Sequence, residues 1–381
     1  MKKILLLAAM AAVLMSMNMS CKPLNGSIGS RPTLEQRLDS LLDANYSASE
    51  PGISLLIAKD GKVLYAGNRG LADMVTRAPI TSTTAFNIAS ISKQFAAVGM
   101  LKMQEQGRLS IEDEVTKYFP EFTNGCWKGI KLWHLMSHTS GIPDLRTGTR
   151  EFKVKATDKE SVQYMYSLDH LNFEPGSNYE YMNPTFQLFS FIIDKESGTD
   201  FESYQQRYLF GPAGMENVRY FGPDKVIPHM AHGYVQDEDN KEWTEYDYGE
   251  ETFFATRADG GIYTTAMDFL KWEVALSSGK IIGNDLLQQA YTPRIKVSGS
   301  KFSSYQNRPD TYYGYGWFID KKPGRETKIY HTGDNGGFQA YAAKYPRSGV
   351  NVIALENRND KDRWEMEMTI ERILQEEGVV L

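Results

Sequence analysis

The chain has 381 residues, of which 41% are hydrophobic and 24% are charged. These values are close to the globular average and exclude collagen-like, coiled-coil and disordered chains. A compact domain averages roughly 100 to 200 residues, so the length allows one large domain or two to three small ones. The formal net charge of −6 gives no attraction to nucleic acid or to an acidic membrane surface. The two cysteines, Cys21 and Cys126, are too few for a disulfide framework or a metal cage.

The amino terminus has the pattern of an export signal. Two lysines precede an apolar run over residues 4–15, and small residues then lead to Cys21. This arrangement resembles the lipobox of bacterial lipoproteins, in which the chain is cut before a cysteine that becomes diacylated, although Asn18 stands where those proteins usually have leucine. The alternative is an ordinary secretory signal with an incidental cysteine. We expect residues 1–20 to be a signal peptide and residues 21–32 to be a linker after a lipidated Cys21.

Two elements are predicted at the start of the domain that follows. Thr33-Leu-Glu-Gln36 has the pattern of a capping box, and leucines after it fall on one helical face, which predicts a helix. The β-rich runs 53–58 and 63–66 then flank Asp60-Gly61, a dipeptide favoured in tight hairpin turns. The sequence therefore predicts an antiparallel pair of strands.

The middle of the chain is predicted to be mainly helical and its end to return to strands. Helical periodicity occurs in residues 92–106 and 185–196, among other pieces. Three strands and a closing helix are expected near the carboxyl end, over residues 329–331, 338–345, 350–355 and 364–377. The simplest arrangement is an α+β domain in which an antiparallel sheet is flanked by helices and a mainly helical subdomain is inserted between the two sheet-forming ends. We place one domain at 33–381, with a sheet subdomain at 33–88 and 255–381 and a helical subdomain at 89–254.

Several kinds of site are excluded or disfavoured by the pattern of residues. There is no Gly-x-Ser-x-Gly elbow, no phosphate-cradling Gly-rich loop with Lys-Ser/Thr, and no His-Glu-x-x-His. The pair His134 and His138 and the pair His229 and His232 lack a third ligand at convincing spacing, so structural histidines are expected and no metal. The acidic stretch 237–251 lacks the order of a calcium loop and is interpreted as a solvated surface.

A serine three residues before a lysine on a helix offers nucleophilic chemistry, because one turn brings the amine beside the hydroxyl. The pattern occurs three times, at Ser90-Ile-Ser-Lys93, Ser277-Ser-Gly-Lys280 and Ser298-Gly-Ser-Lys301. The second and third contain a glycine and lie in polar, loop-like stretches. Only Ser90 begins an apolar helix, in which burial would disfavour the ammonium form of Lys93 and make the amine a usable base.

Together with two further motifs, this pattern resembles the three-motif set of serine β-lactamases and penicillin-binding proteins. The second motif is Tyr181-Met-Asn183 and the third is His331-Thr-Gly333, and the Tyr-x-Asn form points to the branch of class C β-lactamases, D-alanyl-D-alanine carboxypeptidases and esterases. A second Tyr305-Gln-Asn307 lacks the Pro-Gly that precedes the first and the helix that follows it. The resemblance covers about residues 52–355 and implies a β-lactamase/transpeptidase-like fold.

The resemblance also implies a role for each motif residue in acyl transfer. Ser90 would attack the substrate carbonyl, and Lys93 and Tyr181 would share the role of base, the phenol becoming reactive if a cationic neighbour lowers its pKa. Asn183 would hold Lys93 and the substrate amide. The remaining residues follow from the third motif. His331, Thr332 and Gly333 would line the substrate, and the backbone N–H groups of Ser90 and Asp334 would form the oxyanion hole.

Two departures from the family pattern bear on the substrate. His331 replaces the usual lysine and would supply a weaker, pH-dependent positive charge for a substrate carboxylate. Asp334 stands where a small neutral residue is usual, and a carboxylate facing the site would repel an anionic substrate.

We therefore expect an exported serine hydrolase that forms an acyl-enzyme at Ser90. The first expectation is a hydrolase of D-alanyl peptides or amides, carboxypeptidase-like, with weak β-lactamase activity. An esterase of the same mechanism is the first alternative, and a penicillin-binding sensor that does not turn over, or a binding protein, is the alternative of another class. The expected partners are a small-molecule or peptide substrate and, through Cys21 alone, a membrane. No metal or organic cofactor is implied, because the mechanism uses side chains and backbone.

Overall fold

The computed structural model describes residues 31–145, 157–222, 225–246, 256–360 and 362–381. The chain divides after Thr33, and Leu34–Leu381 form one compact unit. The helices and strands of the described residues all lie in this unit.

An eight-stranded antiparallel sheet runs through this unit, and its spatial order explains why both ends of the chain carry strands. The order is β10-β11-β12-β13-β14-β15-β1-β2, so the first hairpin is added to the edge of a meander built from the last third of the chain. The predicted hairpin is confirmed, because the strands β1 and β2 pair antiparallel on either side of Asp60-Gly61. The strands of this sheet are β1 Ile53–Lys59, β2 Lys62–Arg69, β10 Ile295–Lys296, β11 Thr311–Tyr313, β12 Phe318–Asp320, β13 Lys328–Asn335, β14 Phe338–Tyr345 and β15 Val350–Glu356.

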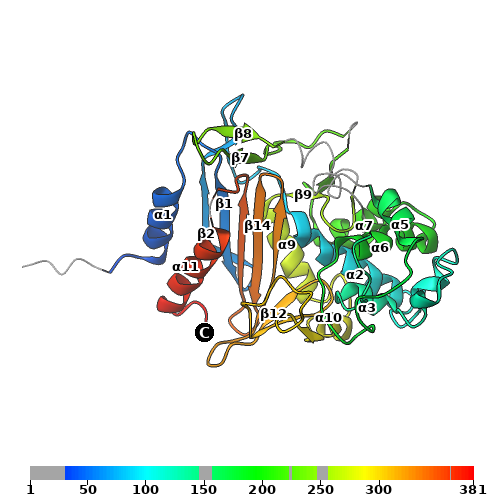
Figure 1. Ribbon diagram of the computed structural model, residues 1–381. Coiled ribbons are helices and arrows are strands. Elements are labelled where there is room, and N and C mark those ends of the chain that lie inside the picture. Colours follow the sequence, from blue (N-terminus) through cyan, green and yellow to red (C-terminus); the bar gives the residue numbers. More distant parts are fainter. Residues whose placement is uncertain (1–30, 146–156, 223–224, 247–255, 361) are drawn as a thin grey trace, which may run out of the picture. The chain divides into compact units, whose positions relative to one another are not determined.

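Helices cover both faces of the sheet (Figure 1). The helices α1 and α11 contact each other on one face, and α9 contacts β15 and β1 on the other. Alternate side chains of β1 accordingly pack into two different hydrophobic clusters, one on each face of the sheet. Because the strand is buried on both faces, its sequence is an almost continuous apolar run. The expected antiparallel sheet flanked by helices is confirmed.

The helices α2, α3, α5, α6 and α7 lie together beside the sheet (Figure 1). Helix α2 is buried over nearly its whole length and packs against α6, as its apolar sequence predicts. The helices are α1 Leu34–Asn45, α2 Ser92–Glu105, α3 Leu132–Met136, α5 Asp158–Met165, α6 Asn183–Ser197, α7 Phe201–Gln205, α8 Gly211–Ala213, α9 Ala266–Ser277, α10 Asn284–Ala290 and α11 Arg363–Glu376, with shorter turns η1 Ala89–Ile91, η2 Val115–Lys117, η3 Gly125–Trp127 and η4 Gln206–Phe210.

Three small antiparallel sheets complete the fold. They consist of β3 Leu71–Asp73 with β4 Ala78–Pro79, of β5 Phe86–Asn87 and β6 Arg219–Tyr220 on either side of β9 Ile262–Thr264, and of β7 Tyr234–Gln236 with β8 Trp243–Glu245. In the described part of the chain, no helix is long and apolar enough to cross a bilayer.

Among the element boundaries that differ from the sequence-based expectation, two concern the first and third motifs. Ser90 does not begin the α-helix but lies in the short turn η1, and α2 starts at Ser92. Strand β13 does not end at His331 but continues to Asn335, so Thr332, Gly333 and Asp334 are strand residues paired with β14. The sequence alone assigns the glycine to a turn, whereas in the fold it permits a close approach between strand and turn.

Candidate active site

Ser90 sits at the junction where strand β5 gives way to the buried helix α2. The preceding residue, Ala89, has a left-handed backbone with φ +46°, which costs free energy for a residue with a side chain. Asn87 stabilises this turn, because its Oδ1 accepts the Ala89 N–H at 2.7 Å. The same oxygen accepts a hydrogen bond from Nδ2 of Asn335 on β13 at 3.3 Å. Ser90, itself half-buried, is thus presented on a constrained turn tied to the sheet.

Lys93 lies one turn further on and is fully buried. Its Nζ donates to Oγ of Ser90 at 3.0 Å and to the carbonyl oxygen of Asp259 at 2.8 Å. It also lies 5.1 Å from the centroid of the Tyr181 ring. These two oxygens replace water as hydrogen-bond partners of the buried nitrogen. The structure therefore brings the predicted nucleophile and base into direct contact.

Tyr181 lies against Lys93 just before α6, and Asn183 is the first residue of that helix. The hydroxyl of Tyr181 and Oδ1 of Asn183 are both buried; among the described residues, Oδ1 of Asn183 has no hydrogen-bond partner, and the Tyr181 hydroxyl interacts with the hydroxyl of Ser90. Burial raises the pKa of Tyr181 well above 10, and the nearby tyrosines Tyr313 and Tyr305 add to the rise, whereas the Ser90 hydroxyl lowers it. The condition set for a reactive phenol, a pKa lowered by a cationic neighbour, is therefore not met in the resting site: Tyr181 is a neutral O–H donor.

His331 on β13 faces this group and is uncharged. Its Nδ1 donates to the carbonyl oxygen of Thr332 at 2.6 Å, so its Nε2 accepts the hydrogen bond from the Tyr313 hydroxyl at 2.9 Å. Burial lowers the pKa of His331 to about 3, and the charge of Lys93 contributes to the lowering. The expectation of a pH-dependent positive charge is therefore wrong, because burial keeps the imidazole neutral even though the bond to Thr332 favours its charged form.

The rest of the third motif packs directly against the turn that holds Ser90. A Cβ at Gly333 would lie 2.3 Å from the carbonyl oxygen of Ile88 and 3.0 Å from Cβ of Ala89, so only glycine fits. Thr332 is buried beside it. The absence of a side chain at Gly333 brings the backbone of β13 to the backbone of η1, which is where the resemblance locates the two oxyanion donors.

The side chain of Asp334 forms an ion pair with an arginine of the last helix. Nη1 of Arg363 lies 2.5 Å from Oδ1 of Asp334 and donates to the carbonyl oxygen of Gly333 at 3.0 Å. Nε of Arg363 also lies 2.9 Å from a carboxylate oxygen of Glu367. Asp334 is exposed, but its charge is paired.

Three contributors to the site were missed by sequence reasoning. The carbonyl of Asp259 has no side-chain signal, because any residue could supply it. Tyr305, set aside with its Tyr-x-Asn repeat, lies 6.2 Å from Tyr181 between ring centroids, so its ring belongs to the site although its motif does not. His138, which the sequence analysis interprets as a structural histidine, lies 4.2 Å from Tyr181 by the same measure.

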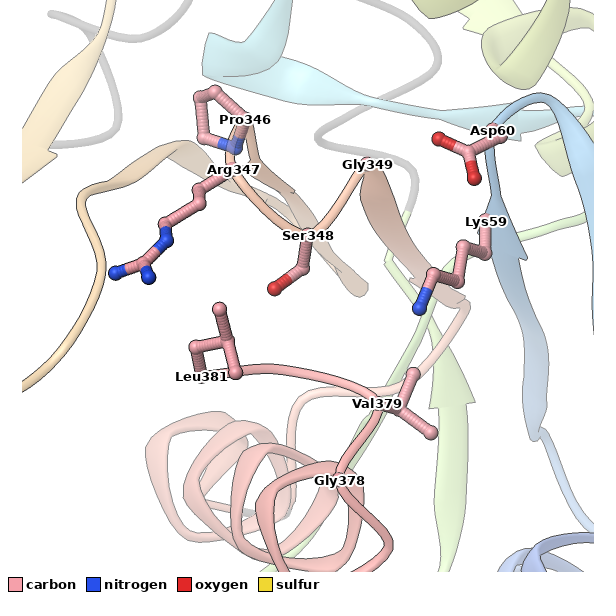
Figure 2. Close-up of a pocket in the computed structure, with 9 residues that line it drawn as sticks. All are labelled: Lys59, Asp60, Pro346, Arg347, Ser348, Gly349, Gly378, Val379 and Leu381. Carbon is pink, nitrogen blue, oxygen red and sulfur yellow. The ribbon is translucent and has the colours of Figure 1, made fainter.

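A cavity of about 340 Å³ lies elsewhere in the fold (Figure 2). It is lined by the two hairpin turns Lys59–Asp60 and Pro346–Gly349 and by the carboxyl-terminal residues Gly378, Val379 and Leu381. None of the motif residues lines it. The described residues also contain no group of three histidines, cysteines or acids placed to hold a metal ion.

Comparison with known proteins agrees with this geometry. A family model described as Beta-lactamase matches residues 34–375. The chain is 27% identical to penicillin-binding protein 4* of Bacillus subtilis over 327 residues, 82% of this chain and 69% of that protein. It is also 27% identical to a beta-lactamase of Yersinia enterocolitica over 346 residues, 81% of this chain and 82% of that protein.

Solved structures share the fold. A penicillin-binding protein from Bacillus halodurans superposes with a TM-score of 0.74 at 25% identity, covering 90% of this chain and 99% of that one. A D-amino acid amidase from Ochrobactrum anthropi, in complex with D-phenylalanine, superposes with a TM-score of 0.72 at 20% identity, covering 90% of this chain and 98% of that one.

Proposed function

Because the chain belongs to the beta-lactamase family of serine hydrolases, we propose that it hydrolyses acyl compounds through a covalent intermediate on Ser90. The observation that carries the proposal is the 3.0 Å contact between Nζ of the fully buried Lys93 and Oγ of Ser90. An amine held within hydrogen-bond reach of a hydroxyl is the arrangement that activates a serine.

The proposed acylation step moves one proton through three side chains. Oγ of Ser90 attacks the substrate carbonyl and passes its proton to the amine form of Lys93. Tyr181, a neutral phenol whose hydroxyl interacts with that of Ser90, donates its proton to the leaving nitrogen or oxygen and is reprotonated by Lys93. Water then attacks the acyl group, and the same side chains carry out the proton transfers in the opposite direction: Tyr181 and Lys93 take up a proton from the water and return a proton to Oγ of Ser90.

The oxyanion of the tetrahedral intermediate needs donors that are fixed before the reaction starts. We propose the backbone N–H groups of Ser90 and Asp334 for this role. Their support is the close approach of η1 and β13 at Gly333, where the strand lies against Ile88 and Ala89. Asn183 would bind the substrate amide, and His331, Thr332 and Gly333 would line the substrate.

The charges on β13 favour a substrate that is neutral on this side. His331 is a neutral imidazole, and the guanidinium of Arg363 is paired with Asp334 and Glu367. Neither group offers an unpaired cation to a substrate carboxylate. We therefore propose D-aminoacyl amides and D-alanyl peptides as substrates, with slow turnover of β-lactams; among peptides, those with a blocked carboxyl end should be preferred.

An ester hydrolase is the second candidate, and the state of Tyr181 favours it. Because burial raises the pKa of the phenol well above 10, Tyr181 is a weak acid. An alcohol leaving group needs less help from an acid than an amine does, so esters would react faster than amides. A penicillin-binding sensor remains the alternative of another class, and it would acylate once without turnover.

Export and anchoring belong to the same proposal but concern residues outside those described. We propose that residues 1–20 are a signal peptide, that Cys21 is lipidated and that the domain at 33–381 faces the periplasm or the cell exterior. Expression of the full chain in a bacterial host tests this: the mature protein should fractionate with membranes, and Cys21→Ala should release it. An unprocessed chain in the cytoplasm would contradict the proposal.

The reaction is tested by intact mass spectrometry of the purified domain after incubation with a penicillin. We expect a stoichiometric adduct in the wild type and none in Ser90→Ala. Hydrolysis of D-amino acid amides and matched esters, followed beyond one equivalent of product, then separates an amidase, an esterase and a sensor. An adduct or turnover that persists in Ser90→Ala would sink the assignment of the nucleophile.

A further inference from the structure

His138 accepts hydrogen bonds from the residues on both sides of Tyr181. Its backbone oxygen accepts the N–H of Glu180 at 3.0 Å, and its Nδ1 accepts the N–H of Met182 at 3.1 Å. The imidazole also lies against the phenol between these two bonds, with 4.2 Å between the ring centroids. One histidine therefore contacts three consecutive residues, of which the middle one is the proposed acid.

The bond from Met182 determines the form of this histidine. An N–H group can only donate, so Nδ1 carries no proton and the neutral ring carries its proton on Nε2. Nε2 is buried and has no hydrogen-bond partner among the described residues. Burial and the charge of Lys93 both lower the pKa of His138, which keeps the ring in this neutral form. A protonated ring would lose its acceptor and release Met182.

The backbone of His138 is as constrained as its ring. Its φ of +57° lies in the left-handed region, which few residues with a side chain adopt, although histidine, asparagine and aspartate adopt it more often than the others. The same segment continues to hold the loop before Tyr181, because the carbonyl oxygens of Thr139 and Gly141 accept the N–H groups of Gly176 and Asn172, each at 2.8 Å. A strained residue held by several bonds is typical of a functional position.

The surroundings of the ring are aromatic and lead into the site. Tyr313, which donates to His331, lies 4.9 Å from His138 between ring centroids, and Phe186 on α6 lies at 5.0 Å. In the described part of the chain, the buried hydroxyl of Tyr181 interacts with the hydroxyl of Ser90 alone. The position of the phenol is therefore set by its neighbours, and His138 constrains it through both backbone and ring.

We propose that His138 is a positioning residue that holds Tyr181 in place for proton transfer to the leaving group. The inference rests on the proposed acyl-enzyme at Ser90 and deepens it. His138 touches neither the nucleophile nor, in this role, the substrate, so its effect on the reaction passes through Tyr181.

A double-mutant cycle on Tyr181 and His138 tests this role. The rate constant for acylation by a chromogenic D-aminoacyl amide, or by a penicillin, is measured in the wild type, in Tyr181→Phe, in His138→Ala and in the double variant. We expect His138→Ala to lose about 30-fold in rate by itself but less than about 3-fold in the Tyr181→Phe background, because its effect requires the phenol. An equal loss in both backgrounds would show a general structural role and overturn the proposal.

Two further variants keep the test decisive if His138→Ala folds poorly. His138→Asn keeps an acceptor for the Met182 N–H and suits a left-handed backbone, so we expect it to recover the rate to within about 5-fold of wild type. A loss in His138→Asn equal to that of Tyr181→Phe, with the fold intact by circular dichroism, would overturn the proposal. His134→Asn is the matched control, since Nδ1 of this buried histidine accepts the N–H of Lys131 at 2.9 Å away from Tyr181.

The two levels of the proposal fail in different ways. If no acyl adduct forms in the wild type, or if it persists in Ser90→Ala, the proposed function fails. If the adduct forms on Ser90 and the cycle shows no coupling between positions 138 and 181, the proposed function stands and the role of His138 fails.

Discussion

The carbonyl oxygen of Asp259 lies 2.8 Å from Nζ of Lys93, and it fixes the amine opposite Ser90. Because the contact uses the backbone, it does not depend on the identity of the side chain at position 259. The carboxylate of Asp259 points elsewhere and accepts from Nε2 of Gln187 at 3.3 Å. The amine is thus held between a helix turn and a loop 166 residues away, and its position is a property of the tertiary fold.

Replacing Lys93 should slow acylation strongly without unfolding the protein. Lys93→Met keeps the length and apolar stem of the side chain but removes the only amine that contacts Ser90 among the described residues. General-base catalysis contributes about 10²- to 10⁴-fold, so we expect a loss of that size in the rate of adduct formation. Lys280→Met, in the exposed second copy of the pattern, is the control and should react as the wild type does. Acylation by Lys93→Met within a few fold of the wild-type rate would contradict the assigned base.

The neutral state of His331 predicts a flat pH dependence where a free histidine would titrate. With a pKa of about 3, the imidazole carries no charge from about pH 5 to pH 8. We therefore expect that titration of His331 causes no rise or fall near pH 6.5 in kcat/KM for a peptide with a free carboxylate. The measurement is the dependence of this kcat/KM on pH in the wild type and in His331→Asn. A change in kcat/KM near pH 6.5 that occurs in the wild type and is absent from His331→Asn would show that His331 does change charge.

The same shift predicts an acid-sensitive fold. The unfolded imidazole has a pKa of about 6.5, so between about pH 6.5 and pH 3 the unfolded chain binds a proton that folded His331 does not. The free energy of unfolding therefore falls as the pH drops through this window. His134, with a pKa lowered by burial to about 4, adds to the effect. Thermal unfolding at pH 7 and pH 4.5 should show a smaller acid-induced drop in Tm for His331→Asn than for the wild type.

Much of the site could be predicted from the sequence where the geometry is local. One helical turn between Ser90 and Lys93 ensures their contact, and a Pro-Gly turn and a helix on either side of Tyr181 separate it from other tyrosines. The charge of His331 and the pKa of Tyr181 could not be predicted in the same way, because both are set by burial among rings from distant strands and loops. The predicted end of β13 comes too early for a related reason. A glycine such as Gly333 indicates a turn when its neighbours in space are unknown, whereas in the fold its missing side chain leaves room for the backbone of Ile88.

That close approach makes Gly333 the most size-sensitive position of the third motif. A methyl group there would lie 2.3 Å from the carbonyl oxygen of Ile88, so Gly333→Ala must push β13 away from the turn that carries Ser90. Overpacking of this kind costs about 1–3 kcal/mol of stability, and the displaced Asp334 N–H should slow acylation by about 10²-fold. Gly125→Ala is the control, because a Cβ there meets nothing within 4 Å. If the thermal stability and acylation rate of Gly333→Ala match those of Gly125→Ala, the close contact is not essential.

The pairing of Asp334 with Arg363 predicts a change in substrate preference. Nη1 of Arg363 lies 2.5 Å from Oδ1 of Asp334, so the two side chains form an ion pair. Without this pairing, the guanidinium of Arg363 would attract the carboxylate of a substrate. Asp334→Asn removes the negative charge, while the bond from Arg363 to the carbonyl oxygen of Gly333 still holds the arginine beside β13. We expect the ratio of kcat/KM for a D-alanyl peptide to that for the same peptide as its carboxyl-terminal amide to rise about tenfold. A charged hydrogen bond at a partly exposed position accounts for roughly that factor.

The comparison of acid and amide separates charge from general damage. A loss of fold or of oxyanion stabilisation would lower kcat/KM for both peptides together and leave their ratio unchanged. Asp285→Asn, at an exposed position in the first turn of α10, is the matched charge control and should alter neither value. If the ratio in Asp334→Asn stays at the wild-type value, Asp334 does not limit access of a carboxylate to Arg363, and the preference for neutral substrates must come from His331 alone.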